Sequence, residues 1–118
     1  MTRTLRNLAA AGLMLAIALA AGAAQALNFD DISGKWCGSV SSYSFAPAQL
    51  TVVLYSDGNS PRRYKIESYQ YEADTITVNW VRDDEKLFTK FSEFSGNDRF
   101  MVQQPNDAGP RREFRRCS

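Results

Sequence analysis

Histidine is absent from the chain of 118 residues. Because histidine is the usual general base near neutral pH and the commonest metal ligand, its absence argues against most hydrolases and against an ordinary zinc site. The serines Ser41, Ser42 and Ser44 therefore have no base to activate them as nucleophiles. The sequence also places no two carboxylates together as glycoside hydrolysis requires. We expect no catalytic residue, and the protein is predicted not to be an enzyme.

Cysteine occurs only twice, as Cys37 and Cys117. In an oxidising compartment the two thiols are expected to form a disulfide. That bond would close a loop of about 80 residues. By restricting the unfolded chain, it would stabilise the fold by roughly 4–5 kcal/mol. With both thiols oxidised no soft metal ligand is left, so the sequence predicts neither a metal site nor a cofactor.

A long apolar run occurs once, at the N-terminus. Residues 1–6 hold two arginines and no acid, residues 8–24 are uncharged and rich in alanine and leucine, and Ala24-Gln25-Ala26 follows. That order is typical of a secretory signal peptide, which we expect to be cleaved after Ala26. The run is mostly alanine with two glycines, which favours a signal peptide over a membrane anchor. No cysteine comes directly after it, so no lipid anchor is expected.

The domain that remains after residues 1–26 are removed, residues 27–118, has 92 residues with 12 basic and 13 acidic side chains. Its net charge near −1 argues against a general nucleic-acid-binding protein. The alanine-rich signal indicates a bacterial protein that is periplasmic or secreted and does not span a membrane once the signal has been cleaved.

Short runs rich in β-branched and aromatic residues alternate with turn residues along the domain, and no sustained helical period is found. This pattern is typical of an all-β sandwich or barrel. In the clearest run, residues 75–81, the side chains of Ile76, Val78 and Trp80 share one face. The expected runs are 34–43, 49–55, 62–71, 75–81, 86–94, 99–104 and 111–118.

The short connections predict antiparallel pairing of consecutive strands in an up-and-down meander. A disulfide between Cys37 and Cys117 needs Cα atoms within about 7 Å, which brings the first strand beside the last and closes a barrel. Those two strands then run antiparallel, which requires an even number of strands. We therefore predict an eighth strand from a bend within Val40 to Ala48, and a single small all-β barrel of about eight strands closed by one disulfide. A two-sheet sandwich is the alternative.

Alternation along these strands places large apolar side chains in the interior of the barrel. Because the inward candidates are mostly large, we expect the protein's own side chains to fill the interior rather than to leave a cavity. The predicted core residues are Trp36, Val40, Leu50, Val52, Leu54, Ile66, Ile76, Val78, Trp80, Leu87, Phe91, Phe100, Val102 and Phe114.

The segment FDDISGKWCG resembles the opening of lipocalins and related calycins, in which a Gly-x-Trp stands at the start of the first strand. On that resemblance Gly34 and Trp36 match the motif, and the tryptophan closes the floor of the barrel. The resemblance also implies an arginine near the last strand that packs over the tryptophan, a role open to Arg112, Arg115 or Arg116. As a function it implies a carrier of a small apolar ligand or lipid.

Arginine is concentrated around the last expected strand and after the first hairpin. Six of these arginines are candidate binding groups for an anionic partner, such as lipid headgroups, lipopolysaccharide or an acidic protein surface. The alternative, which the sequence favours, is ordinary outward-facing strand positions balanced by nearby acids. The six residues are Arg111, Arg112, Arg115, Arg116, Arg62 and Arg63.

Two tyrosines of the third expected run are candidate interface residues. Tyr69 and Tyr71 fall on the face opposite Ile66 if alternation holds along the run. Exposed tyrosines near arginines suit a protein interface. The alternative, again favoured by the sequence, is cross-strand pairing that stabilises the sheet.

Together these features predict an exported, non-enzymatic β-barrel that acts as a protein-interaction or inhibitor-like module. Its expected partner is an unknown protein or an anionic component of the cell envelope, and no nucleic acid. The alternative is a lipocalin-like carrier of a small apolar ligand or lipid inside the barrel.

Overall fold

The computed structural model describes residues 25–95, 98–102 and 110–118. Nearly all of the predicted signal peptide, residues 1–24, lies outside the described residues. No helix in the described part of the chain has the length and hydropathy that crossing a membrane requires.

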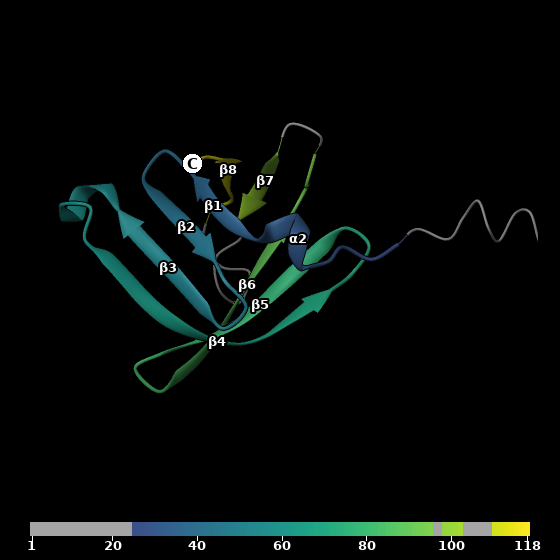
Figure 1. Ribbon diagram of the computed structural model, residues 1–118, viewed down its shortest axis with the longest axis horizontal. Helices are drawn as coiled ribbons and strands as arrows, with labels where there is room; N and C mark the ends of the chain where they lie inside the picture. The colour runs from purple at the N-terminus through teal and green to yellow at the C-terminus, as the bar shows by residue number, and fades with distance from the viewer. Residues whose placement is uncertain (1–24, 96–97, 103–109) are drawn as a thin grey trace, which may run out of the picture.

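The described residues form a closed antiparallel β-barrel in which each strand pairs with the next and the last pairs with the first (Figure 1). This confirms the predicted all-β, up-and-down barrel of eight strands. The elements are helix α2 (Phe29–Ile32), strands β1 (Gly34–Cys37), β2 (Ser41–Phe45) and β3 (Gln49–Leu54), the 3-10 turn η1 (Tyr55–Asp57), and strands β4 (Pro61–Tyr71), β5 (Thr75–Arg82), β6 (Glu85–Ser92), β7 (Arg99–Val102) and β8 (Arg112–Arg116).

The alternating strand directions give the barrel two different ends (Figure 1). Helix α2, the connections after β2 and β4, and the end of β6 lie at one end of the barrel, which we call the helix end. The turn after β1, the 3-10 turn η1 and the turn after β5 lie at the opposite end. The capping box of Asn28, whose side chain accepts a hydrogen bond from the backbone of Asp30, begins α2 and fixes the entry of the chain into β1.

The expected first run, residues 34–43, is wrong as a single strand. The chain turns at Gly38, whose N–H donates to the carbonyl of Ser41 at 2.8 Å, and the eighth strand is β2, within the predicted range Val40 to Ala48. A Cβ on Gly38 would lie 2.9 Å from the buried ring of Phe114. The close approach of backbone and ring explains why a glycine stands at this turn.

Four aromatic side chains, Trp36, Phe91, Phe100 and Phe114, fill the barrel toward the helix end and form what we call the aromatic plug. Each is at most 1% exposed. The ring of Phe100 lies 4.0 Å from that of Trp36, 5.2 Å from that of Phe91 and 5.6 Å from that of Phe114. Edge-to-face and offset contacts of this kind add to the free energy gained from burial.

Most of the predicted core is confirmed. Val40 is an error, because it follows the Gly38 turn and is 46% exposed. Ile32 of α2 and Phe45 of β2 are also buried, although the sequence did not predict them as core residues. The confirmed buried residues are Trp36, Leu50, Ile66, Ile76, Val78, Phe91, Phe100, Val102 and Phe114, whereas Val52, Leu54, Trp80 and Leu87 are half-buried.

A β-bulge in β4 changes the face on which two tyrosines lie. The register shifts between Ile66, which pairs with Trp80, and Ser68, which pairs with Asn79. Beyond the bulge Tyr69 and Tyr71 therefore take the same face as Ile66, and both pack against the core. The expectation that they face away from Ile66 is wrong, because one extra residue in the strand inverts the alternation.

Candidate functional site

The seam between β1 and β8 closes the barrel. Only two register pairs join these strands, Trp36 with Arg116 and Cys37 with Arg115. The predicted disulfide is present beside them, between Cys37 and Cys117, with Cα atoms 5.9 Å apart. Few backbone hydrogen bonds join the first and last strands here, and the disulfide adds a covalent link between them.

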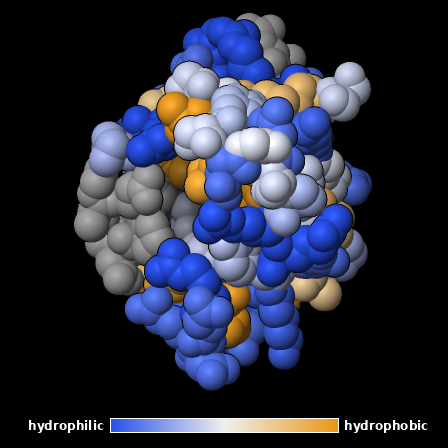
Figure 2. Space-filling model, turned by 90° about the vertical axis from the view of Figure 1, so that its left-hand side faces the viewer, coloured by the Kyte–Doolittle hydropathy of each residue, from blue (hydrophilic) through white to orange (hydrophobic). Residues whose placement is uncertain are grey.

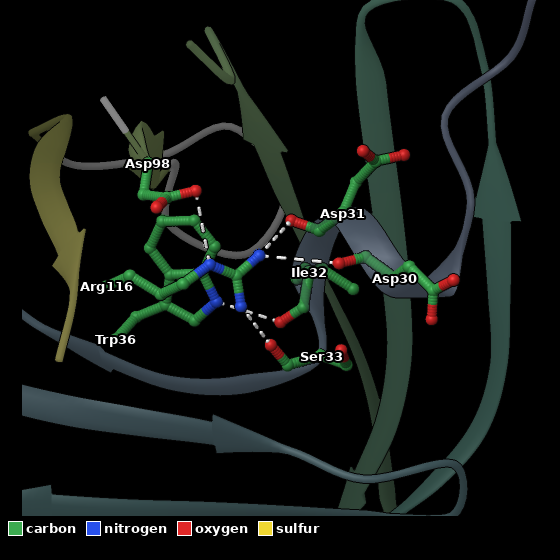
Figure 3. Close-up of polar contacts among 7 residues, drawn as sticks. All are labelled: Asp30, Asp31, Ile32, Ser33, Trp36, Asp98 and Arg116. Atoms are coloured by element: carbon green, nitrogen blue, oxygen red, sulfur yellow. Dashed lines mark hydrogen bonds and ion pairs between the residues drawn. The ribbon is translucent and has the colours of Figure 1, made fainter. Parts of the chain in front are cut away.

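Arg116 ties this seam to α2 through three backbone carbonyls (Figure 3). Its guanidinium donates to the carbonyl oxygens of Ser33 at 2.5 Å, Asp31 at 3.1 Å and Asp30 at 3.3 Å. The last carbonyls of a helix have no partner within the helix, so the arginine supplies the missing donors. Its Nε also lies 3.3 Å from the Asp98 carboxylate.

The same guanidinium lies over Trp36, 4.5 Å from the centre of the ring (Figure 3). The indole Nε1 of Trp36 donates to the carbonyl of Ile32 at 2.8 Å. The ring is therefore positioned by Arg116 over its face and by Ile32 at its edge. This is the packing of arginine over tryptophan that the lipocalin resemblance implies, with Arg116 as the partner. Each of its three guanidinium nitrogens donates within the chain, which gives Arg116 a structural role at the seam.

Of the other candidate arginines, Arg111, Arg112 and Arg115 line one open surface pocket of about 430 Å³ beside the disulfide. Arg111 pairs with Glu93 at 2.5 Å and Arg115 approaches Glu113 at 4.0 Å, both on the exposed outer surface. Arg63 is exposed and alternates with inward-facing neighbours, so it points outward. Exposed pairs of this kind contribute little to stability. The strand register places Arg62 and Arg112 on the inner face of the barrel instead, at the end opposite α2.

A cavity of about 220 Å³ opens at the end opposite α2, which we now call the cavity end. All of its lining residues occupy inward-facing strand positions above the aromatic plug. Figure 2 looks toward this end and shows hydrophobic side chains between hydrophilic ones. The lining residues are Tyr43, Leu50, Val52, Leu54, Arg62, Tyr64, Trp80, Arg82, Thr89 and Val102.

The cavity wall combines aromatic rings with hydroxyl groups. The rings of Tyr64 and Trp80 lie 5.1 Å apart, and the indole of Trp80 donates to the Thr89 hydroxyl at 3.1 Å. Burial raises the pKa of Tyr43, and the positive charge of Arg112 acts on it in the opposite direction. The wall is therefore mostly apolar, with a few fixed polar groups, as is common in small-molecule sites.

Three inward-facing arginines stand at the cavity end: Arg62 on β4, Arg82 on β5 and Arg112 on β8. Arg62 and Arg82 line the cavity directly, whereas the exposed Arg112 lines the neighbouring surface pocket with Arg111 and Arg115. Two exposed apolar side chains lie at the same end, Val40 at 46% and Tyr55 at 41%. The Tyr55 N–H donates to the Val40 carbonyl at 3.0 Å, so the two are neighbours.

The expectation of a filled interior is wrong at the cavity end, where the rings of Tyr43, Tyr64 and Trp80 line the cavity without filling it. The small inward residue Thr89, between Leu87 and Phe91, leaves space there. The sequence did hold an indication of this cavity. Alternation along the strands places Arg62 and Arg82 on the inner face, and charged side chains are rare in a filled core.

In the described residues no group of three Cys, Asp or Glu side chains is arranged as metal ligands would be. Comparison with protein families, with curated proteins and with solved structures finds no match to this chain.

Proposed function

We propose that this protein is an exported, non-enzymatic binding protein that holds a small, partly apolar ligand in the cavity at the cavity end of its barrel. One observation carries the proposal: a cavity of about 220 Å³ lined by inward side chains, in a barrel whose other end is tightly packed. Protein interiors are otherwise close-packed, and small-molecule sites are among the few concave, mostly apolar spaces in a domain.

The chemistry of the wall supports binding rather than catalysis. The described residues that line the cavity offer aromatic rings, alkyl groups, three hydroxyls and two guanidinium groups, but no carboxylate or thiol. Carboxylates and thiols are among the commonest catalytic bases and nucleophiles, so a wall without them favours binding. The cavity is smaller than the roughly 300–1,000 Å³ typical of sites for drug-sized molecules, which favours a short chain or a single ring.

Two features support export. The N-terminal segment has the order of a secretory signal peptide. The Cys37–Cys117 disulfide fits an oxidising compartment such as the periplasm or the extracellular space.

A pair of neighbouring substitutions on β3 tests the proposal. Val52 lines the cavity, whereas Val53 faces outward on the same strand. We expect native mass spectrometry of the protein purified from the periplasm to show a bound small molecule, or titration with short-chain amphiphiles to change Trp80 fluorescence. Val52→Phe should abolish the binding, and Val53→Phe should not. No binding to the wild-type protein, or equal binding to both variants, would contradict the proposal.

A protein-interaction or inhibitor-like module is the second candidate, and the exposed pair Val40 and Tyr55 favours it. Exposed apolar side chains beside arginines suit the centre of a protein interface. The test is crosslinking in periplasmic extract: a specific partner should be lost in the double variant Val40→Ser, Tyr55→Ser and retained in Val52→Phe. If no partner depends on these two residues, this second candidate fails while the cavity proposal stands.

A further inference from the structure

We infer that the ligand of the cavity is an anion: a carboxylate or sulfate-like head group at the arginines Arg62, Arg82 and Arg112, attached to a short apolar body that enters the cavity. The inference rests on the proposed function and specifies the ligand's chemistry. It follows from the register of the strands, from the charges at the cavity end and from the composition of the wall.

The strand register places the three arginines on the inner face. Arg62 pairs with Val52, and Arg82 lies two residues beyond Trp80, so both continue the inward rows of the cavity wall. Arg112 pairs with Val102 and alternates with the buried Phe114. Because these residues belong to β4, β5 and β8, the positive charge comes from different sides of the barrel.

The charge of these arginines is only partly neutralised. Arg62 lies 2.5 Å from Asp57, and Arg82 lies 3.3 Å from Glu85, with every side chain of the two pairs more than 40% exposed. Exposed pairs are weak, so a ligand anion can replace or share either carboxylate.

Arg112 differs from the other two. In the part of the chain that the structure describes, no ion pair joins it to a carboxylate. It nevertheless lies next to the cavity, because it pairs with Val102 of the cavity wall, and its positive charge opposes part of the rise that burial causes in the pKa of Tyr43, another wall residue. An inward-facing guanidinium with no carboxylate partner is well suited to bind an anionic oxygen, to which it donates in a planar fork.

Apolar side chains line the cavity below the arginines. Leu50, Val52 and Val102 supply alkyl surface, and Trp80 supplies a ring that is half-buried. The hydroxyls of Tyr43 and Tyr64 lie in the same wall and are donors in their neutral form. An anionic head with a short apolar body satisfies both regions, whereas a cation would meet three like charges.

Four eight-carbon probes test the inference: octanoate, octyl sulfate, octan-1-ol and octylammonium, each kept below its micelle concentration and titrated by Trp80 fluorescence. We expect one of the two anions to bind at least about tenfold more tightly than the alcohol, because charged hydrogen bonds are the stronger ones. Octylammonium should bind more weakly than the alcohol. The anion that binds better identifies the head group.

Arg112→Gln is the variant, with Arg115→Gln as a matched control on the outer face of the same strand. Arg112→Gln should weaken anion binding about tenfold and leave alcohol binding unchanged. Arg115→Gln should change neither. Raising the salt concentration should weaken only the anions.

The outcomes separate the two proposals. Alcohol binding equal to anion binding, or anion binding unchanged in Arg112→Gln, overturns the anion inference and leaves the binding function standing. If none of the four probes binds and the purified protein carries no small molecule, the binding function itself is overturned.

Discussion

The guanidinium of Arg116 lies 4.5 Å from the centre of the Trp36 ring, where the last strand of the barrel meets the first. The same arginine donates to the carbonyl oxygens of Ser33, Asp31 and Asp30. The closure of the barrel therefore has three parts: a ladder of two residue pairs, the disulfide and one arginine that joins β8 to α2.

Removing this arginine should destabilise the fold. In Arg116→Ala three backbone carbonyls and the Trp36 ring lose their partner, which we expect to lower the free energy of unfolding by about 1–2 kcal/mol. Arg116→Lys should recover only part of the loss, since an ammonium group cannot reproduce the planar fork. Urea unfolding measures both. Arg115→Ala is the matched control, because its side chain is exposed and should change stability by less than about 0.5 kcal/mol. Equal losses in Arg116→Ala and Arg115→Ala would contradict the structural role.

Removing the disulfide should have a larger effect. The bond closes a loop with a sequence separation of 80 residues, so Cys37→Ala combined with Cys117→Ala should lower the free energy of unfolding by about 4–5 kcal/mol through loop-closure entropy. Chemical denaturation of the double variant measures this. A loss of less than about 1 kcal/mol would show that the ladder and Arg116 close the barrel without help.

The closed barrel could be predicted from the sequence because two simple constraints combine. Alternation of apolar residues marks the strands, as in Ile76, Val78 and Trp80 of β5. The cysteines near both ends then require adjacent, antiparallel first and last strands. Together these two constraints predict eight strands. They include β2, which composition alone does not separate from β1.

What could not be predicted depends on contacts between distant residues. The bulge after Ile66 is set by pairing with β5, so alternation alone placed Tyr69 and Tyr71 on the wrong face. The turn at Gly38 depends on the ring of Phe114, which lies far along the chain. The cavity likewise depends on how side chains from several strands meet inside the barrel, which no single strand reveals.

Gly38 gives a third prediction. A Cβ at this position would lie 2.9 Å from the Phe114 ring, which is buried in the aromatic plug and cannot move freely. Gly38→Ala should therefore lower the free energy of unfolding by about 1–3 kcal/mol, as overpacking usually does. Thermal or urea unfolding measures the change. Ser39→Ala, at the next and exposed position, is the control and should have little effect. If the two variants are equally stable, the contact with the ring does not constrain the turn.

The final prediction concerns alkaline pH. Burial raises the pKa values of Tyr43, Tyr69 and Tyr71 above the ordinary value of 10.0, so the folded state holds their protons more tightly than the unfolded state does. The stability that they contribute is fully present below pH 10 and decreases as the pH rises above it, because unfolding then releases protons. We expect the urea midpoint to be constant between about pH 7 and pH 9 and to fall by pH 11. Tyr43→Phe removes one of these ionisable groups, so its midpoint should fall less between pH 9 and pH 11 than that of the wild-type protein. A wild-type midpoint that is unchanged at pH 11, or an equal fall in Tyr43→Phe, would contradict the burial of the Tyr43 hydroxyl in the cavity wall.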